Sequence, residues 1–274
     1  MAWFNKKTVS LDQQNNPALP LTVNFDKDIC QQILQRLIDD LAEHGGIEAG
    51  VESLQKKHEL FRTVLDINAV GTLDREQFNS LFDCVFPARR RLDSVLAATA
   101  LDDLAEYIRS LLFGSDEVNV RLENFLALQI QTDKKARRAA WDLAAELLHY
   151  YDPDQYPLMT RWVWDANAMS GSLREFIRGN DSLSEIPISC TLEHFQAARE
   201  WLIIQLSTHG FYRDEPFVTN LLLARAYAEY VLAMSQSMGM MNSGFGGKME
   251  HFDFMGKLLG IDGYQRNKAR PSMQ

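Results

Sequence analysis

The sequence predicts an all-α fold: a single multi-helix globular domain of about ten helices. Apolar residues recur every three or four positions in at least six segments, and the predicted connections are short. Convincing alternating strands are absent, since Leu21–Val23 offers at most one short strand. We expect residues 1–24 to form an extended lead, residues 25–237 the helical domain, and residues 238–274 a flexible Gly/Met-rich tail with a short amphipathic helix.

The first half of the chain predicts helices separated by glycine or proline. A repeat of Ile and Leu marks the first, which Asp26 or Asp28 can cap and which His44–Gly46 ends. Pro87 is expected to end a later helix, because proline lacks an amide donor. The same spacing predicts helices over about residues 47–65, 74–86 and, in two parts, 88–113.

The centre of the fold is expected in residues 121–165. An apolar stripe from Ala136 to Tyr151 indicates a helix, and the proline of Asp152–Asp154 ends it. Aromatic residues are dense after this break, which is typical of a core. We predict that Trp3 is exposed. The mostly buried tryptophans are expected to be Trp141, Trp162, Trp164 and Trp201.

Three further helices are expected beyond the centre. Residues 172–178 form a short one, Thr191 can cap the next, and Pro216 lies in the first turn of the last. Glycine at Gly210 ends the middle one.

Composition disfavours several classes of protein. No run of about 18 uncharged apolar residues occurs, and the first residues lack the apolar core of a signal peptide, so we expect a cytoplasmic protein without a membrane partner. The cysteines Cys30, Cys84 and Cys190 are odd in number and far apart, which indicates reduced thiols. The net charge of −9 disfavours nucleic acid as a partner.

Two basic runs nonetheless leave a nucleic-acid-associated protein as an alternative. The alternative interpretation of both runs is a solvated helix face, which is common for charges of one sign. The residues concerned are Arg89, Arg90, Arg91, Lys134, Lys135, Arg137 and Arg138.

A segment beginning at Asp66 resembles the EF-hand calcium loop. The resemblance implies oxygen ligands at Asp66, Asn68 and Asp74. It departs from the family at Val70, which replaces an oxygen ligand, and at Gln77, where a bidentate glutamate normally closes the shell. We therefore favour a helix–loop–helix corner in which Asp74 caps the second helix.

A second metal hypothesis rests on Glu146 and His149, three residues apart on the central helix. Such a pair occurs in di-iron helical bundles, which need a second pair and two more glutamates. With Asp142 it forms a stripe opposite the apolar one, so we predict a solvated acidic face instead. A metal-dependent helical enzyme whose residues converge only in the fold remains the enzymatic alternative.

The favoured function is a non-enzymatic protein-interaction, adaptor or assembly-type module. No phosphate loop, dinucleotide fingerprint or nucleophile elbow occurs, so no cofactor is predicted. The C-terminal helix is expected to dock on another protein or on a second copy, although it can also fold back on its own domain. The residues predicted to bind the partner are Phe252, Phe254, Met255, Leu258 and Leu259.

Overall fold

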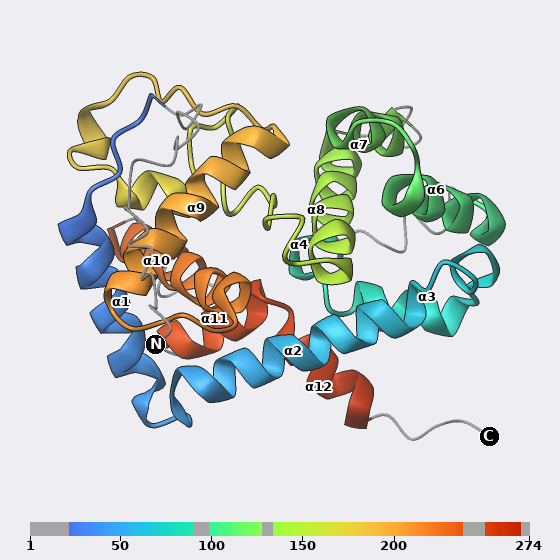
Figure 1. Cartoon of the computed structure of the whole chain (residues 1–274), viewed down its shortest axis with the longest axis horizontal. Helices are drawn as coiled ribbons and strands as arrows, with labels where there is room; N and C mark the ends of the chain where they lie inside the picture. The colour runs from blue at the N-terminus through green and yellow to red at the C-terminus, as the bar shows by residue number, and fades with distance from the viewer. Residues whose placement is uncertain (1–21, 90–98, 128–133, 238–249, 270–274) are drawn as a thin grey trace, which may run out of the picture.

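Helix α8 (Lys134–Tyr151) packs on α2, α4, α6 and α7, and in Figure 1 it lies beside α6 and α7. This computed structural model describes residues 22–89, 99–127, 134–237 and 250–269. Every residue of α8 from Asp142 to Tyr150 is buried. An amphipathic helix at the surface would expose one side, so this part of α8 is enclosed all round, while Lys134, Lys135, Arg137 and Arg138 in its first turns are exposed.

The described residues confirm an all-α domain. They contain two isolated bridges, Phe25–Ile177 and Asp165–Ser170, and no β-strand. The α-helices are α1 (Lys27–Ala42), α2 (Gly46–Val64), α3 (Arg75–Phe82), α4 (Phe86–Arg89), α6 (Leu101–Phe113), α7 (Val118–Ala127), α8, α9 (Leu192–Thr208), α10 (Glu215–Ser237), α11 (His251–Leu258) and α12 (Ile261–Ala269). Short 3-10 helices are η1 (Val70–Thr72), η2 (Ser172–Phe176) and η3 (Asn180–Ser182).

The helices form two groups that α2 connects. In Figure 1 the helices α1, α9, α10 and α11 gather on one side and α3, α6 and α7 on the other, while α2 runs along the edge of both. Helix α8 packs on α2, α4, α6 and α7, and α10 packs on α1, α2, α9 and α11. The core therefore joins segments that are far apart in the sequence.

The helix starts follow the predicted capping chemistry at Asp26 and Asp74, whereas Thr191 stands at the start of α9 but its side chain makes no capping hydrogen bond. Asp26 accepts hydrogen bonds from the amides of Asp28 and Ile29 at 2.9 and 3.2 Å. Asp74 and Gln77 form a capping box, with each side chain accepting from the backbone amide of the other at 2.8 and 2.9 Å. Such caps replace the hydrogen bonds that the first turn of a helix lacks.

Pro87 does not end a helix as the sequence predicts. The predicted helix over residues 74–86 ends at Phe82, and Pro87 lies inside the first turn of α4. A missing amide donor costs nothing in a first turn, because that amide has no partner within the helix.

The aromatic core agrees with the sequence at its centre. Trp164 is fully buried and Trp162 is 5% exposed, while Trp141 and Trp201 are partly buried. The indole of Trp164 donates to the carbonyl of Ile188 at 2.8 Å. Trp3 lies outside the described residues.

The C-terminal helices α11 and α12 pack on the body of this chain. Met255, Leu258 and Leu259 are at most 2% exposed, and Phe252 and Phe254 are partly buried against the same core. The apolar face that the sequence offers to a partner is therefore already covered by α10, α1 and α4, because folding back removes it from water. Association through these five residues would require α11 to leave α10.

Two glycines bring the start of α12 against the backbone that follows α3. A Cβ on Gly260 would lie 1.6 Å from the carbonyl oxygen of Cys84, and one on Gly263 would lie 1.9 Å from that of Asp83. Gly260 also has a φ of +71°, which favours glycine. This close approach has no room for any other residue.

Replacing Gly260 by alanine is therefore expected to lower the free energy of unfolding by at least about 2 kcal/mol, from the clash and the backbone strain together. Gly256→Ala is the matched control, because a Cβ there meets nothing within 4 Å. That change is expected to be neutral or to stabilise α11 by up to about 1 kcal/mol. Urea unfolding of both variants measures the difference, and equal stabilities would contradict the close approach.

Candidate functional site

The polar stripe of α8 is buried. The prediction that this stripe forms a solvated acidic face is therefore wrong. Asp142, Glu146 and His149 are at most 1% exposed. The apolar stripe correctly marks one buried side, but helices cover the opposite side as well. Each of the three polar side chains has its own partner from another element, as buried polar groups require.

Glu146 pairs with Lys57 of α2, which is fully buried. The Lys57 Nζ lies 2.5 Å from Glu146 Oε2 and donates to the carbonyls of Cys84 at 2.9 Å and Leu259 at 2.7 Å. The ammonium has three donors, so all of them are satisfied. It also lies 3.8 Å from the centre of the Tyr150 ring. Burial raises the pKa of Glu146 to about 7, although Lys57 opposes this shift.

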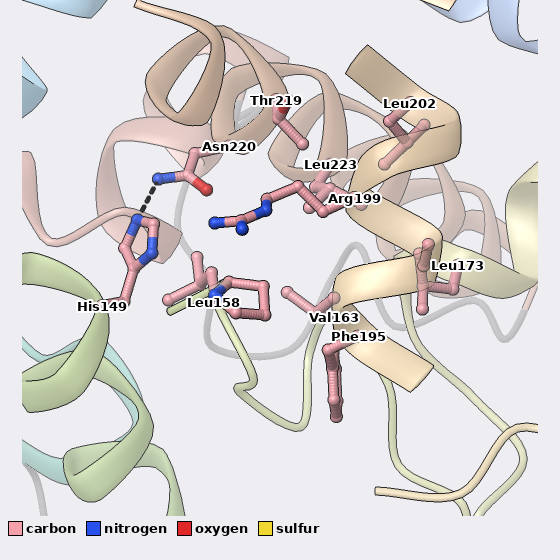
Figure 2. Close-up of a pocket in the computed structure, with 12 residues that line it drawn as sticks. His149, Leu158, Val163, Leu173, Phe195, Arg199, Leu202, Thr219, Asn220 and Leu223 are labelled. Atoms are coloured by element: carbon pink, nitrogen blue, oxygen red, sulfur yellow. Dashed lines mark hydrogen bonds between the residues drawn. The ribbon is translucent and has the colours of Figure 1, made fainter. Parts of the chain in front are cut away.

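His149 is held neutral by its surroundings. Its Nδ1 lies 2.7 Å from the carbonyl oxygen of Tyr156, so this nitrogen carries the proton and donates. Its Nε2 then accepts from the amide of Asn220, also at 2.7 Å, a bond that Figure 2 shows. Burial lowers the pKa of His149 to about 3. The adjoining cavity has a volume of about 10 Å³, the size of about one water molecule, and is too small for a ligand.

Asp142 binds Arg161, which lies in the segment after α8. One carboxylate oxygen accepts the backbone amide of Arg161 at 2.8 Å, and the other accepts its guanidinium at 2.7 and 3.1 Å. Burial raises the pKa of Asp142, and the charge of Arg161 opposes this shift. The bidentate contact fixes the direction of the Arg161 side chain.

The residues of the two alternative metal hypotheses do not form a metal-binding cluster in the described residues. Glu146 and His149 are each engaged with a different partner, and no group of three or more His, Cys, Asp or Glu side chains there is placed to hold a metal ion. Asp66 accepts from the backbone and side-chain amides of Asn68 at 2.9 and 3.1 Å, while Asp74 caps α3. The calcium-loop residues thus form a helix–loop–helix corner.

The lowered pKa of His149 makes the free energy of unfolding depend on pH. Its pKa is lower in the folded chain than the ordinary 6.5, so the stability it contributes is present above pH 6.5 and is lost as pH falls toward 3. Glu146 acts in the opposite sense, because its raised pKa favours the folded chain below about pH 4.5 and less as pH rises through 7. The two effects oppose each other between these limits.

His149→Gln is expected to reduce the acid sensitivity of the fold. Glutamine cannot take up a proton. Between pH 4 and 6 the slope of unfolding free energy against pH should therefore fall by the amount that corresponds to the uptake of about one proton on unfolding. Urea unfolding at several pH values measures this slope. His209→Gln is the control, because His209 is exposed at the end of α9. A slope that is unchanged in His149→Gln would contradict the neutral, buried imidazole.

A second group of polar residues lines a pocket at the N-terminal end of α8. A pocket of about 380 Å³ opens there, between α7, α8 and the segment after α8; we call it the α7–α8 pocket. Its volume is within the usual range for small-molecule sites. It is lined by Glu123, Leu126, Lys134, Arg137, Arg138, Trp141, Arg161, Asp165, Asn167 and Cys190.

Cations outnumber carboxylates in the α7–α8 pocket, with four against two. Arg137 pairs with Glu123 at 3.3 Å, and Arg161 lies 3.7 Å from Asp165. Lys134 and Arg138 are exposed and form no ion pair within the described residues. The positive end of the α8 dipole lies at the same place, since the helix begins at Lys134. The pocket therefore favours an anion.

The other predicted basic residues do not line this pocket. Arg89 donates to both carboxylate oxygens of Asp262 at 2.8 and 3.0 Å, so it fastens α12 to α4. Arg90 and Arg91 lie outside the described residues. Lys135 is exposed on the first turn of α8. Of the seven predicted basic residues, the pocket is lined by Lys134, Arg137 and Arg138.

The sequence carried part of the signal for the pocket. Trp141 follows the basic residues at i+7, i+4 and i+3, so all of them share one face of α8. Arg161 and Asn167 could not be found this way, because they come from an irregular segment that only the fold places there. Asp142 orients Arg161 from within the core.

No protein-family model, curated protein or solved structure matches this chain. Among the described residues, no helix is both long enough and apolar enough to span a bilayer.

Proposed function

We propose that this chain is a binding module that holds a phosphate-bearing ligand in the α7–α8 pocket. The observation that carries the proposal is the pair Lys134 and Arg138, two exposed cations beside a hollow and without a carboxylate partner in the described residues. Phosphate oxygens are strong acceptors, and guanidinium and ammonium groups are their usual donors in proteins. Arg161 adds a third donor whose direction Asp142 already fixes.

This proposal joins two of the predicted classes. It keeps the non-enzymatic binding module, and it takes its ligand chemistry from the nucleic-acid alternative. The C-terminal route to a partner is less well supported, because Met255, Leu258 and Leu259 are buried within the chain. The metal-dependent enzyme also lacks support, since the acidic residues of α8 are each engaged in the core.

Thermal unfolding in the presence of tripolyphosphate at about 50 mM salt tests the proposal. A ligand that binds only the folded chain at 100 times its Kd stabilises it by about 2.7 kcal/mol, so the melting temperature should rise. The double variant Lys134→Ala/Arg138→Ala should abolish most of this rise. Low salt is chosen because phosphate contacts weaken as salt increases.

The control is Arg75→Ala/Arg213→Ala, which removes the same charge from exposed residues that do not line the pocket. It should keep the full rise in melting temperature. If both double variants lose the rise equally, binding reflects overall charge, and the pocket has no special role. If the unaltered chain shows no rise, the proposed ligand chemistry is refuted.

A further inference from the structure

We infer that the α7–α8 pocket receives one unpaired nucleotide of a single strand, with its base against Trp141 and its phosphate on the cations of α8. This inference rests on the proposed function, since it assumes a phosphate-bearing ligand. It adds the chemical class of that ligand. Two features of the pocket support it, an aromatic wall and a polar edge, and the small number of free cations favours a single strand over a duplex.

The aromatic wall is fixed in place. Trp141 is partly buried and donates its indole N–H to the carbonyl oxygen of Met159 at 2.7 Å. A ring that is held before binding loses little conformational entropy when a base stacks on it. Stacking of a base on an aromatic side chain contributes about 1–3 kcal/mol and tolerates any base.

Cations and ring follow one another along a single helix face. Arg138 precedes Trp141 by three residues, which is about 4.5 Å along the helix axis. Lys134 lies one turn further from the ring on the same face. A ligand that lies along this face therefore meets positive charge first and an aromatic surface next, which matches the order of phosphate and base in a nucleotide.

The polar edge comes from a short turn after Arg161. Asp165 accepts from the backbone amides of Asn167 and Ala168 at 3.1 and 3.3 Å, and the bridge to Ser170 closes this turn. The carboxylate of Asp165 is thereby occupied, while the side chain of Asn167 is exposed at the pocket. An amide offers both donors and acceptors to the edge of an unpaired base.

Free positive charge is too scarce for a long duplex contact. The chain carries a net charge of −9, and two of the four pocket arginine and lysine side chains are paired with carboxylates. A site with two or three phosphate contacts on a single strand predicts a slope of log K against log salt of about −1.4 to −2.1. Stacking on Trp141 must then add to the affinity that these few phosphate contacts supply.

Binding of fluorescein-labelled oligonucleotides, measured by anisotropy at several salt concentrations, tests this inference. The probes are a 12-nucleotide thymidine strand, an abasic strand of equal length, and a duplex of equal length. The thymidine strand should bind about 5- to 150-fold more tightly than the abasic strand, in line with the stacking contribution. It should also bind more tightly than the duplex.

Two variants of Trp141 separate stacking from fold. Both Trp141→Phe and Trp141→Leu lose the hydrogen bond to Met159, but only phenylalanine keeps an aromatic face. Trp141→Leu should bind the thymidine strand no better than the abasic strand, with an unchanged salt slope. Trp141→Phe should keep most of the difference between the two probes.

The outcomes distinguish this inference from the proposed function. If thymidine and abasic strands bind equally and tripolyphosphate still stabilises the chain, anion binding stands and the nucleotide assignment is overturned. Tighter binding of the duplex also overturns it. If neither the strands nor tripolyphosphate bind at about 50 mM salt, the proposed function fails as well.

Discussion

Lys57→Met is expected to lower the free energy of unfolding by about 3–5 kcal/mol, because it leaves the carboxylate of Glu146 buried without its partner. It also removes the donor that serves the carbonyls of Cys84 and Leu259. Urea unfolding followed by circular dichroism measures the loss. Lys56→Met is the matched control: the side chain of that lysine is 44% exposed and pairs with Glu52 one turn away, so its loss should change stability by less than about 0.5 kcal/mol.

A second substitution tells which role of Lys57 dominates. In Lys57→Met/Glu146→Leu the buried charge is gone, and only the two carbonyls lose their donor. We expect this double variant to be more stable than Lys57→Met alone, since apolar side chains often replace a buried ion pair at little cost. If the double variant is equally or less stable, Lys57 acts mainly by holding α11 through the carbonyl of Leu259.

The burial of Lys57 could have been predicted from its position on the helix, although not from its charge. Lys56 and Lys57 have the same side chain, yet Leu54, Lys57 and Phe61 are spaced three and four apart, on the buried stripe of α2. A lysine on such a stripe predicts a buried partner. Its identity could not be predicted, because Glu146 is 89 residues away in the sequence.

The prediction that one face of α8 meets solvent was wrong for a related physical reason. Polar residues were assigned to water, which holds for a helix with one buried side. Asp142, Glu146 and His149 of α8 instead each meet a specific partner inside the core, from the segment after α8, from α2 and from α10 respectively. The starts of α1 and α3 were predictable, because Asp26 and Asp74 cap them through contacts within a few residues.

Helix α12 could not be predicted, since its sequence IDGYQRNKA carries no apolar repeat. Long-range contacts hold it: the Arg89–Asp262 ion pair and the close backbone approach at Gly260 and Gly263. In the α7–α8 pocket, too, some residues are predictable from local sequence and others depend on long-range contacts. The stripe from Lys134 to Trp141 is local and visible in the sequence, whereas Arg161 comes from a segment that only the fold brings near.

Leu258→Ala is expected to lower the free energy of unfolding by about 2–4 kcal/mol, although the sequence analysis predicts that this residue binds a partner. Leu258 is 2% exposed and α11 packs on α10 and α1, so alanine leaves a cavity inside this chain. Asp253→Ala on the same helix is the control, because Asp253 is exposed and should change stability by less than about 0.5 kcal/mol.

Truncation of the chain after Gln236 measures the largest loss of unfolding free energy that a substitution in α11 can cause. Substitutions in α11 can cost no more than the free energy that holds this segment on the body, because beyond that point the segment detaches before the rest unfolds. The shortened chain should therefore be at least as destabilised as Leu258→Ala. Light scattering on the same samples reports association. If both changes leave the melting temperature unaltered but abolish association, α11 serves a partner rather than the core, and the packing on α10 is not what holds it.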